Sequence, residues 1–104
     1  MLTAQNIAEY FLKKNDPDSG EGISNLIIQK LVYYAQGFHL ALTNGLPLFN
    51  EPILAWEHGP VVEGLYQLYR HYGSSEIPQP NSVDLKLFTV EQIEILNEVF
   101  EVYG

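Results

Sequence analysis

The side chains of this sequence best suited to metal chemistry are three histidines, and their spacing does not form a metal site. His39, His58 and His71 show neither HExxH nor HxH spacing. His58 and His71 lie on either side of a predicted helix about 18 Å long, so they are far apart. The chain has no cysteine, which excludes thiolate zinc ligands and disulfides. We therefore expect no metal and no other cofactor, and we expect His39 to pack or hydrogen-bond within its helix.

Hydrolytic chemistry has one candidate location, the corner formed by Gly59 and Pro60. Glu57 and Glu63 flank this corner, and either carboxylate together with His58 would supply an acid–base pair. A solvated acid at the start of a helix explains Glu63 equally well. The stretch EHGPVVEG lacks the glycines and the lysine of a phosphate-binding loop, and no serine lies in a GxSxG motif. We expect no enzymatic activity and keep a hydrolase based on His58 as a competing hypothesis.

The charge of the chain argues against nucleic acid as a partner. Its 104 residues carry 13 acidic and 5 basic side chains, a formal net charge of −8. Lys13 and Lys14 are the only adjacent basic pair, whereas phosphate binding needs clustered basic side chains. The negative field either attracts a basic partner or only keeps the protein soluble. Because no apolar run reaches the roughly 18–20 residues of a membrane span and no signal-peptide pattern is present, we expect a soluble cytoplasmic protein.

The length and the 46% hydrophobic content predict one domain over residues 1–104. Apolar residues recur at helical spacing in four segments, 3–15, 23–45, 60–73 and 89–104. Thr3, Ser24 and Thr89 are the expected N-caps. The proline-rich stretch before the third helix predicts two short strands, near 48–49 and 53–57, that pair as a hairpin. We therefore predict a mainly α fold of the α+β class, with four to five helices around a central helix and a small β-hairpin.

Several single residues carry structural expectations. Trp56 is expected to pack the hairpin onto the central helix, where its removal would open a cavity. Gly59 permits the sharp reversal of the chain, and Pro60 is expected at the first position of the third helix. Gly37 lies inside the central helix and predicts the close approach of another backbone. The segment 83–88 predicts one further short strand.

Aromatic side chains are frequent, with seven Tyr, five Phe and one Trp, and aromatic residues are the usual anchors of protein interfaces. Phe38, Tyr69 and Phe100 are expected in the core, whereas Tyr33 and Tyr66 are better candidates for the surface. His58 has no structural role in the predicted corner. We therefore expect five residues to contact a partner protein: Tyr33, Gln36, His58, Glu63 and Tyr66. An exposed aromatic side chain or an unpaired strand would also allow a homodimer.

An ordered set of motifs runs through residues 25–69. The central helix carries Q-K-L-x-Y-x-A-Q-G-x-H-L, followed by P-L-F, then A-W-x-x-G-P-V, then a helix with a tyrosine. The residues of this set are Gln29, Lys30, Leu31, Tyr33 or Tyr34, Ala35, Gln36, Gly37, His39, Leu40, Pro47, Leu48, Phe49, Ala55, Trp56, Gly59, Pro60, Val61 and Tyr66. Each piece is weak alone, but their combination resembles the Panacea domain family, also described as SocA-like and as phage-associated GepA-type proteins.

The resemblance implies a mostly helical domain that acts as an antitoxin in a toxin–antitoxin module. It implies that the domain binds and neutralises a cognate protein toxin, and at least one family member resembles a proteolytic adaptor that delivers its toxin to an ATP-dependent protease. Family members usually continue beyond the position of Gly104, so we expect a natural C-terminal extension. The competing hypothesis is a phage-type regulatory protein that binds another host factor.

Overall fold

The structure, a computed structural model, describes residues 1–104 apart from the side chain of Pro17. Four α-helices, one two-stranded antiparallel sheet and three short 3-10 turns follow one another along these residues. Their order is α1 (Ala4–Lys14), η1 (Pro17–Ser19), α2 (Asn25–Leu42), β1 (Leu54–Trp56), β2 (Gly59–Val61), α3 (Glu63–Tyr69), η2 (Arg70–Tyr72), η3 (Leu85–Leu87) and α4 (Val90–Tyr103). The predicted mainly α fold with a small β-hairpin is therefore confirmed.

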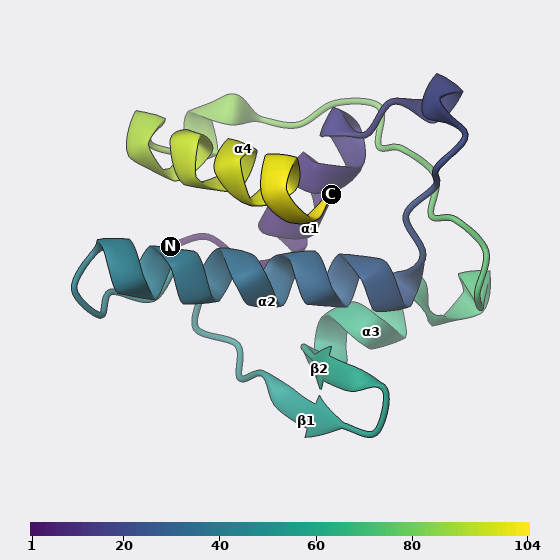
Figure 1. The fold of residues 1–104 in the computed structure, drawn as a ribbon, viewed down its shortest axis with the longest axis horizontal. Helices are drawn as coiled ribbons and strands as arrows, with labels where there is room; N and C mark the ends of the chain where they lie inside the picture. The colour runs from purple at the N-terminus through teal and green to yellow at the C-terminus, as the bar shows by residue number, and fades with distance from the viewer.

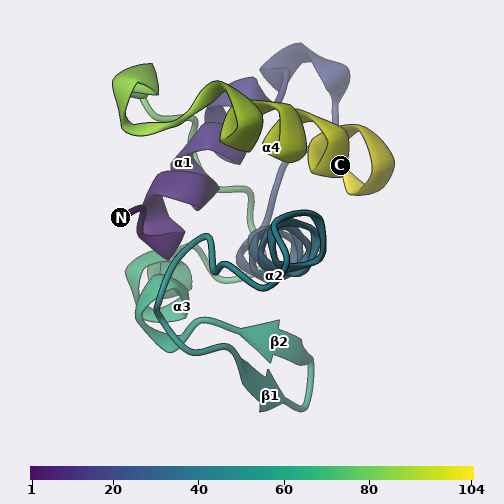
Figure 2. The same cartoon turned by 90° about the vertical axis from the view of Figure 1, so that its left-hand side faces the viewer.

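Helix α2 is the centre of the molecule, and two groups of elements cover its opposite sides. Helices α1 and α4 lie on one side, while α3 and the hairpin lie on the other, as Figures 1 and 2 both show. The hydrophobic core draws its buried members mainly from α1, α2 and α4, among them Ile7, Phe11, Ile28, Leu31, Leu96 and Val99. In the described part of the chain, none of the helices combines the length and the apolar character needed to cross a membrane.

The starts of the three long helices follow the expected caps. The Thr3 hydroxyl accepts from the Asn6 N–H and forms a capping box, and Thr89 does the same with Gln92. The Ser24 hydroxyl accepts from the Ile27 N–H at the start of α2. These caps depend on residues three positions apart, so local sequence is enough to predict them.

The hairpin forms, but one of its strands lies elsewhere than predicted. Leu54 to Trp56 pair with Gly59 to Val61, so both strands come from residues 54–61. Residues 48–49 do not join this sheet. Instead, Phe49 makes an isolated parallel bridge with Leu2, ahead of α1.

Pro60 lies in strand β2, opposite Ala55, so the prediction that it opens the third helix was wrong. Val62 takes the N-cap position with an extended backbone, and the helix begins at Glu63. A proline is tolerated in β2 because each strand of a two-stranded sheet is an edge strand. Gly59 adopts a φ of +127°, which confirms that the reversal needs a glycine.

Two further structural expectations were wrong. Residues 85–87 form the 3-10 turn η3 rather than a strand, because the Asp84 carboxylate accepts from the Lys86 N–H and starts a turn. Gly37 is exposed, and no atom beyond its chain neighbours and the backbone of its own helix lies within 4 Å of the position that its Cβ would occupy. A closely approaching backbone therefore does not explain this glycine, and nothing in the structure does.

One face of α2 carries a row of polar side chains. Residues 25, 29, 32, 36, 39 and 43 follow one another at spacings of four and three, which keeps them on one side of the helix. Val32 is the apolar member of this row. The other five are Asn25, Gln29, Gln36, His39 and Thr43, and each hydrogen-bonds to the backbone or to a neighbour in the row. We call these five residues the polar row.

The first two members of the polar row fix the short helix α3. Gln29 is 2% exposed; its Oε1 accepts from the Val62 N–H at 2.9 Å and its Nε2 donates to Asn25 Oδ1 at 3.0 Å. Asn25 Nδ2 donates in turn to the Tyr66 carbonyl at 3.1 Å. Val62 has no side-chain cap of its own, and the Arg70 N–H bonds to Gln67 rather than Tyr66. Side chains of α2 therefore complete hydrogen bonds near both ends of α3.

The last three members of the polar row hold the segment that follows α2. Gln36 accepts from the Leu48 N–H at 2.6 Å and donates to the Phe49 carbonyl at 2.8 Å. His39 Nδ1 donates to the Leu46 carbonyl at 2.7 Å, which places the imidazole proton on Nδ1. The Thr43 hydroxyl donates to the His39 carbonyl and accepts from the Leu46 N–H at 3.3 Å. These bonds satisfy backbone groups of a segment that has no regular secondary structure, and they hold that segment against α2 ahead of the hairpin.

Removing the Gln29 amide tests this construction. Gln29→Met keeps the length of the side chain but leaves the Val62 N–H and Asn25 Oδ1 without partners. We expect the free energy of unfolding, measured by urea denaturation, to fall by about 2–4 kcal/mol. Gln5→Met, on the exposed side of α1, is the matched control, with an expected change below about 0.5 kcal/mol. Equally small losses in both variants would contradict the capping role of Gln29.

Candidate functional site

Trp56 lies at the surface of the hairpin, so the prediction that it is buried against α2 was wrong. Its side chain is 38% exposed, and its ring packs edge-on against Tyr66 of α3, with 5.0 Å between the ring centroids. Val61 and Val62, at 1% and 3% exposed, are the buried residues of this corner. Because these valines and the Gln29 amide already hold the corner to α2, the indole is not needed to seal it.

A mostly apolar groove lies on one side of the Trp56 ring. Its volume is about 370 Å³, and its lining residues are Tyr33, Ile53, Leu54, Ala55, Trp56, Gly59 and Pro60. Tyr33 reaches it from α2 and is 44% exposed, which confirms its expected place at the surface. We call this feature the hairpin groove.

A second, more polar depression, which we call the Arg70 hollow, lies beside Tyr66. Its volume is about 290 Å³, and its lining residues are Ser24, Asn25, Leu26, His58, Tyr66, Arg70, Gly73 and Ser74. His58 reaches it from the turn between the strands, while Arg70 follows the end of α3. The loop after α3 and the start of α2 complete its wall.

The Trp56–Tyr66 ring pair joins the two depressions, because Trp56 lines the hairpin groove and Tyr66 lines the Arg70 hollow. We call the groove, the hollow and the ring pair between them the hairpin surface. Three of the five predicted contact residues, Tyr33, His58 and Tyr66, come together on it. The residue that links them, Trp56, was predicted only as a structural residue.

The other two predicted contact residues lie apart from the hairpin surface. Gln36 is half-buried, and both atoms of its amide already bond to the backbone at residues 48–49. Glu63 is exposed in the first turn of α3 and lines neither depression. Arg70 and Leu26 are the surface residues that sequence reasoning missed. The one available signal was that Arg70 is the single arginine of the chain.

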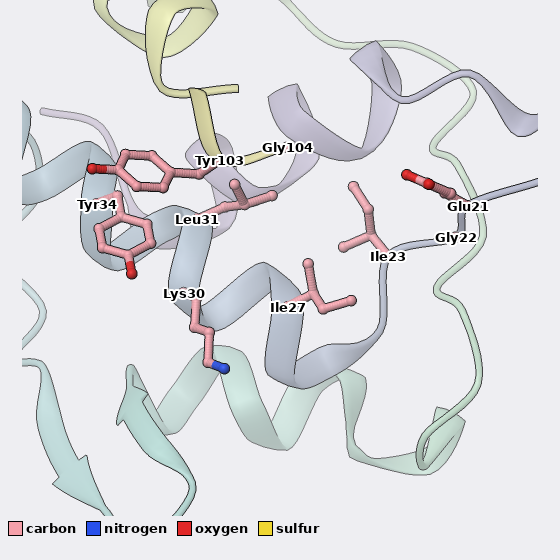
Figure 3. A pocket seen from close by; sticks show the side chains of 9 residues that line it. All are labelled: Glu21, Gly22, Ile23, Ile27, Lys30, Leu31, Tyr34, Tyr103 and Gly104. Carbon is pink, nitrogen blue, oxygen red and sulfur yellow. The ribbon is translucent and has the colours of Figure 1, made fainter. Parts of the chain in front are cut away.

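A third depression lies on the other side of α2, against the end of α4. It has a volume of about 380 Å³, and Figure 3 shows the apolar side chains of Ile23, Ile27 and Leu31 along it. The rings of Tyr34 and Tyr103 close one end as a stacked pair, with 3.9 Å between their centroids. Local sequence patterns do not indicate this depression, because it depends on how α4 meets α2.

The arrangement around His58 does not assemble the acid–base pair of the hydrolase hypothesis. Neither Glu57 nor Glu63 lines the hollow that contains His58.

Burial, followed by the charges of Glu9 and Tyr72, raises the pKa of Tyr69 to about 12, so its phenol stays neutral at neutral pH. Within the described residues, no group of three or more His, Cys, Asp or Glu side chains is placed to hold a metal ion.

Comparison with known proteins identifies the class of this protein. The family model described as "Antitoxin SocA-like, Panacea domain" matches residues 28–104, so the chain belongs to this family. Among individual relatives, the chain is similar to Antitoxin SocA of Caulobacter vibrioides (strain NA1000 / CB15N), with 42% identity over 55 residues. The aligned part makes up 53% of this chain and 29% of the relative. No solved structure matches the chain.

Membership of the family confirms the resemblance seen in the motifs, and the structure gives several of those motif residues a physical role. Gln29, Gln36 and His39 belong to the polar row. In the P-L-F motif, the Leu48 N–H donates to the Gln36 amide and the Phe49 carbonyl accepts from it.

The exposure of Trp56 gives a stability prediction. Trp56→Ala removes a half-exposed ring with one edge-to-face partner, so we expect the free energy of unfolding to fall by only about 1–2 kcal/mol. Leu65→Ala removes a side chain of α3 that is 4% exposed, and the resulting cavity is expected to cost about 2–5 kcal/mol. Thermal or urea unfolding of both variants provides the comparison. An equal loss of unfolding free energy in both variants would mean that Trp56 contributes as much to stability as a core residue, which would contradict its surface position.

Proposed function

We propose that this chain is an antitoxin domain that neutralises its cognate toxin by direct binding through the hairpin surface. The observation that carries the proposal is the exposure of Trp56, the only tryptophan, at the centre of two joined depressions. A large aromatic side chain that the fold does not bury is available to a partner. The family supplies the kind of partner, which is a toxin.

The composition of the hairpin surface supports this role. Trp, Tyr and Arg are the residue types enriched in the energetic centres of protein interfaces, and Trp56, Tyr33, Tyr66 and Arg70 provide all three. Leu26, 42% exposed, adds an apolar contact beside the Arg70 hollow. The toxin would therefore bury aromatic anchors at the centre of its contact and polar groups at the rim.

The size of a stable interface sets how far the contact extends. A standard interface buries roughly 800 Å² on each partner, whereas the exposed surface of the whole chain is 6397 Å². The contact would therefore take about an eighth of the surface, more than the two depressions alone. We propose that it continues from the hairpin onto the exposed side of α3, where Leu68 is 43% exposed.

Co-expression with the product of the adjacent gene tests the proposal. We expect that product to stop growth alone, and to be harmless and co-purify in the presence of this chain. Tyr33→Ala and Trp56→Ala should each weaken binding by at least about 30-fold, the effect of losing an interface anchor. Isothermal titration calorimetry of the purified pair measures this change.

Leu87→Ala and Val90→Ala are the matched controls. Leu87 and Val90 are 52% and 75% exposed, near the start of α4, on the opposite side of α2 from the hairpin. Both variants should bind and neutralise the toxin as well as the unaltered chain. The proposed surface is wrong if the α4 variants lose binding while the hairpin variants keep it, and the antitoxin role is wrong if the neighbouring product is harmless alone.

We also propose, on the family resemblance, that the bound toxin is delivered to an ATP-dependent protease. Direct occlusion predicts that the antitoxin leaves the toxin half-life unchanged, whereas delivery predicts that it shortens the half-life. After protein synthesis is stopped, immunoblotting measures toxin decay in cells with and without the candidate protease. We expect decay to be faster with the antitoxin and to slow at least about twofold without the protease, a loss that one removed degradation route would cause. If neither the antitoxin nor the protease changes the rate of toxin decay, delivery to a protease is wrong and direct occlusion is the mechanism.

A further inference from the structure

We propose that the Arg70 hollow binds the carboxylate of an acidic side chain on the partner protein. The inference rests on the proposed function, because it assigns the chemistry of one part of the hairpin surface. The toxin would have to supply an acidic side chain beside the residues that contact Trp56 and Tyr66.

The charge of the hollow runs against the charge of the chain. The chain carries 13 acidic and 5 basic side chains, and Arg70 is its only arginine. Arg70 and His58 both line the hollow, and none of its eight lining residues is Asp or Glu. The depression at the end of α4, by contrast, has both an acidic residue, Glu21, and a basic residue, Lys30, in its lining. A cationic pocket in a protein of net charge −8 is a local feature that solubility does not explain.

The hydrogen-bond donors of the hollow are largely uncommitted. The Arg70 guanidinium donates through Nη1 to the neutral amide of Gln67 at 3.4 Å, a long contact that leaves most of its N–H groups for a ligand. Tyr66 and Ser74 add hydroxyl groups to the lining. The Asn25 amide is already engaged, because its Nδ2 donates to Tyr66 and its Oδ1 accepts from Gln29.

The shape of the hollow favours a side chain over a larger ligand. Its volume of about 290 Å³ lies at the lower limit of small-molecule sites, which span roughly 300–1,000 Å³. A planar guanidinium binds a carboxylate through two parallel hydrogen bonds, which matches the end of an Asp or Glu side chain. The hollow also adjoins the exposed Trp56–Tyr66 pair, so its occupant belongs to a molecule that covers both. A protein segment with an acidic residue beside an apolar one meets these conditions.

Nuclear magnetic resonance titration with two short peptides tests the proposal without the toxin. The probes are acetyl-Ala-Glu-Leu-amide and its neutral counterpart acetyl-Ala-Gln-Leu-amide, with inorganic phosphate as a third ligand. We expect the Glu peptide to cause saturable shifts at the amides of Leu26 and Ser74 and at the Arg70 side chain. The Gln peptide and phosphate should bind more weakly, by up to roughly fivefold, which is the most that an exposed charge pair usually contributes.

Substitutions at Arg70 separate charge from structure. Arg70→Gln should weaken binding of the Glu peptide roughly fivefold and make the two peptides equivalent. Arg70→Lys keeps the charge but not the paired hydrogen bonds, so part of the preference for Glu should remain. Lys86→Gln, an exposed cation on η3 outside the hollow, is the matched control and should bind as the unaltered chain does. Arg70 is exposed, and amide spectra of the free variants check that the fold is kept.

Each contrary result overturns the assignment. Equal binding of the two peptides would mean that the hollow does not recognise a carboxylate, and tighter binding of phosphate would make it a site for a free anion. Shifts at the same residues that grow with protein concentration alone would make a second copy of the chain the occupant. An absence of shifts would remove the site. The assay contains no toxin, so these failures are distinct from a failure of the antitoxin role, which the co-expression experiment detects.

Discussion

The structure depends on hydrogen bonds from the side chains of α2 to the backbone of segments that have little regular structure. Residues 43–53 form neither a helix nor a strand of the hairpin, yet Leu48 and Phe49 are 2% and 0% exposed. Buried backbone groups need partners, and the Gln36 amide supplies an acceptor and a donor to these two residues. Glu51 fixes the same segment to α1, since its carboxylate accepts from the Ala4 N–H. A two-stranded hairpin, marginal alone, thereby gains a fixed place.

This construction leaves the aromatic side chains of the hairpin available at the surface. Val61 and Val62 supply the buried apolar contact of the corner, while Gln29 supplies its polar contact. Trp56 is 38% exposed and packs edge-on against Tyr66, so most of the stability of the corner does not depend on the indole. A surface built on a fixed backbone loses little conformational freedom when it binds, which favours affinity. The buried amides and the exposed rings are therefore two parts of one arrangement.

Sequence reasoning predicted what depends on neighbouring residues and failed where distant residues decide. Thr3, Ser24 and Thr89 cap their helices through bonds to residues three positions later, so their roles could be predicted from the local sequence. The place of Trp56 depends on which side of a three-residue strand meets α2, and no periodicity reveals this. Gln36 was grouped with Tyr33 as a contact residue because both looked polar-facing on one helix. Tyr33 lines the hairpin groove, whereas the Gln36 amide hydrogen-bonds to the backbone of Leu48, twelve residues later.

The acidic charge of the chain and the cationic Arg70 hollow act at different distances. At physiological salt, fields of exposed charges are screened beyond about 8 Å, so the net charge of −8 affects encounter more than the final contact. It favours approach by a partner that is basic overall. Once the surfaces meet, the Arg70 guanidinium in the lining of the hollow favours an acidic group there. A basic protein that presents one acidic side chain beside an apolar anchor satisfies both conditions, whereas a uniformly basic protein places a cation against Arg70. Electrostatic complementarity of this kind selects orientation more than it adds affinity.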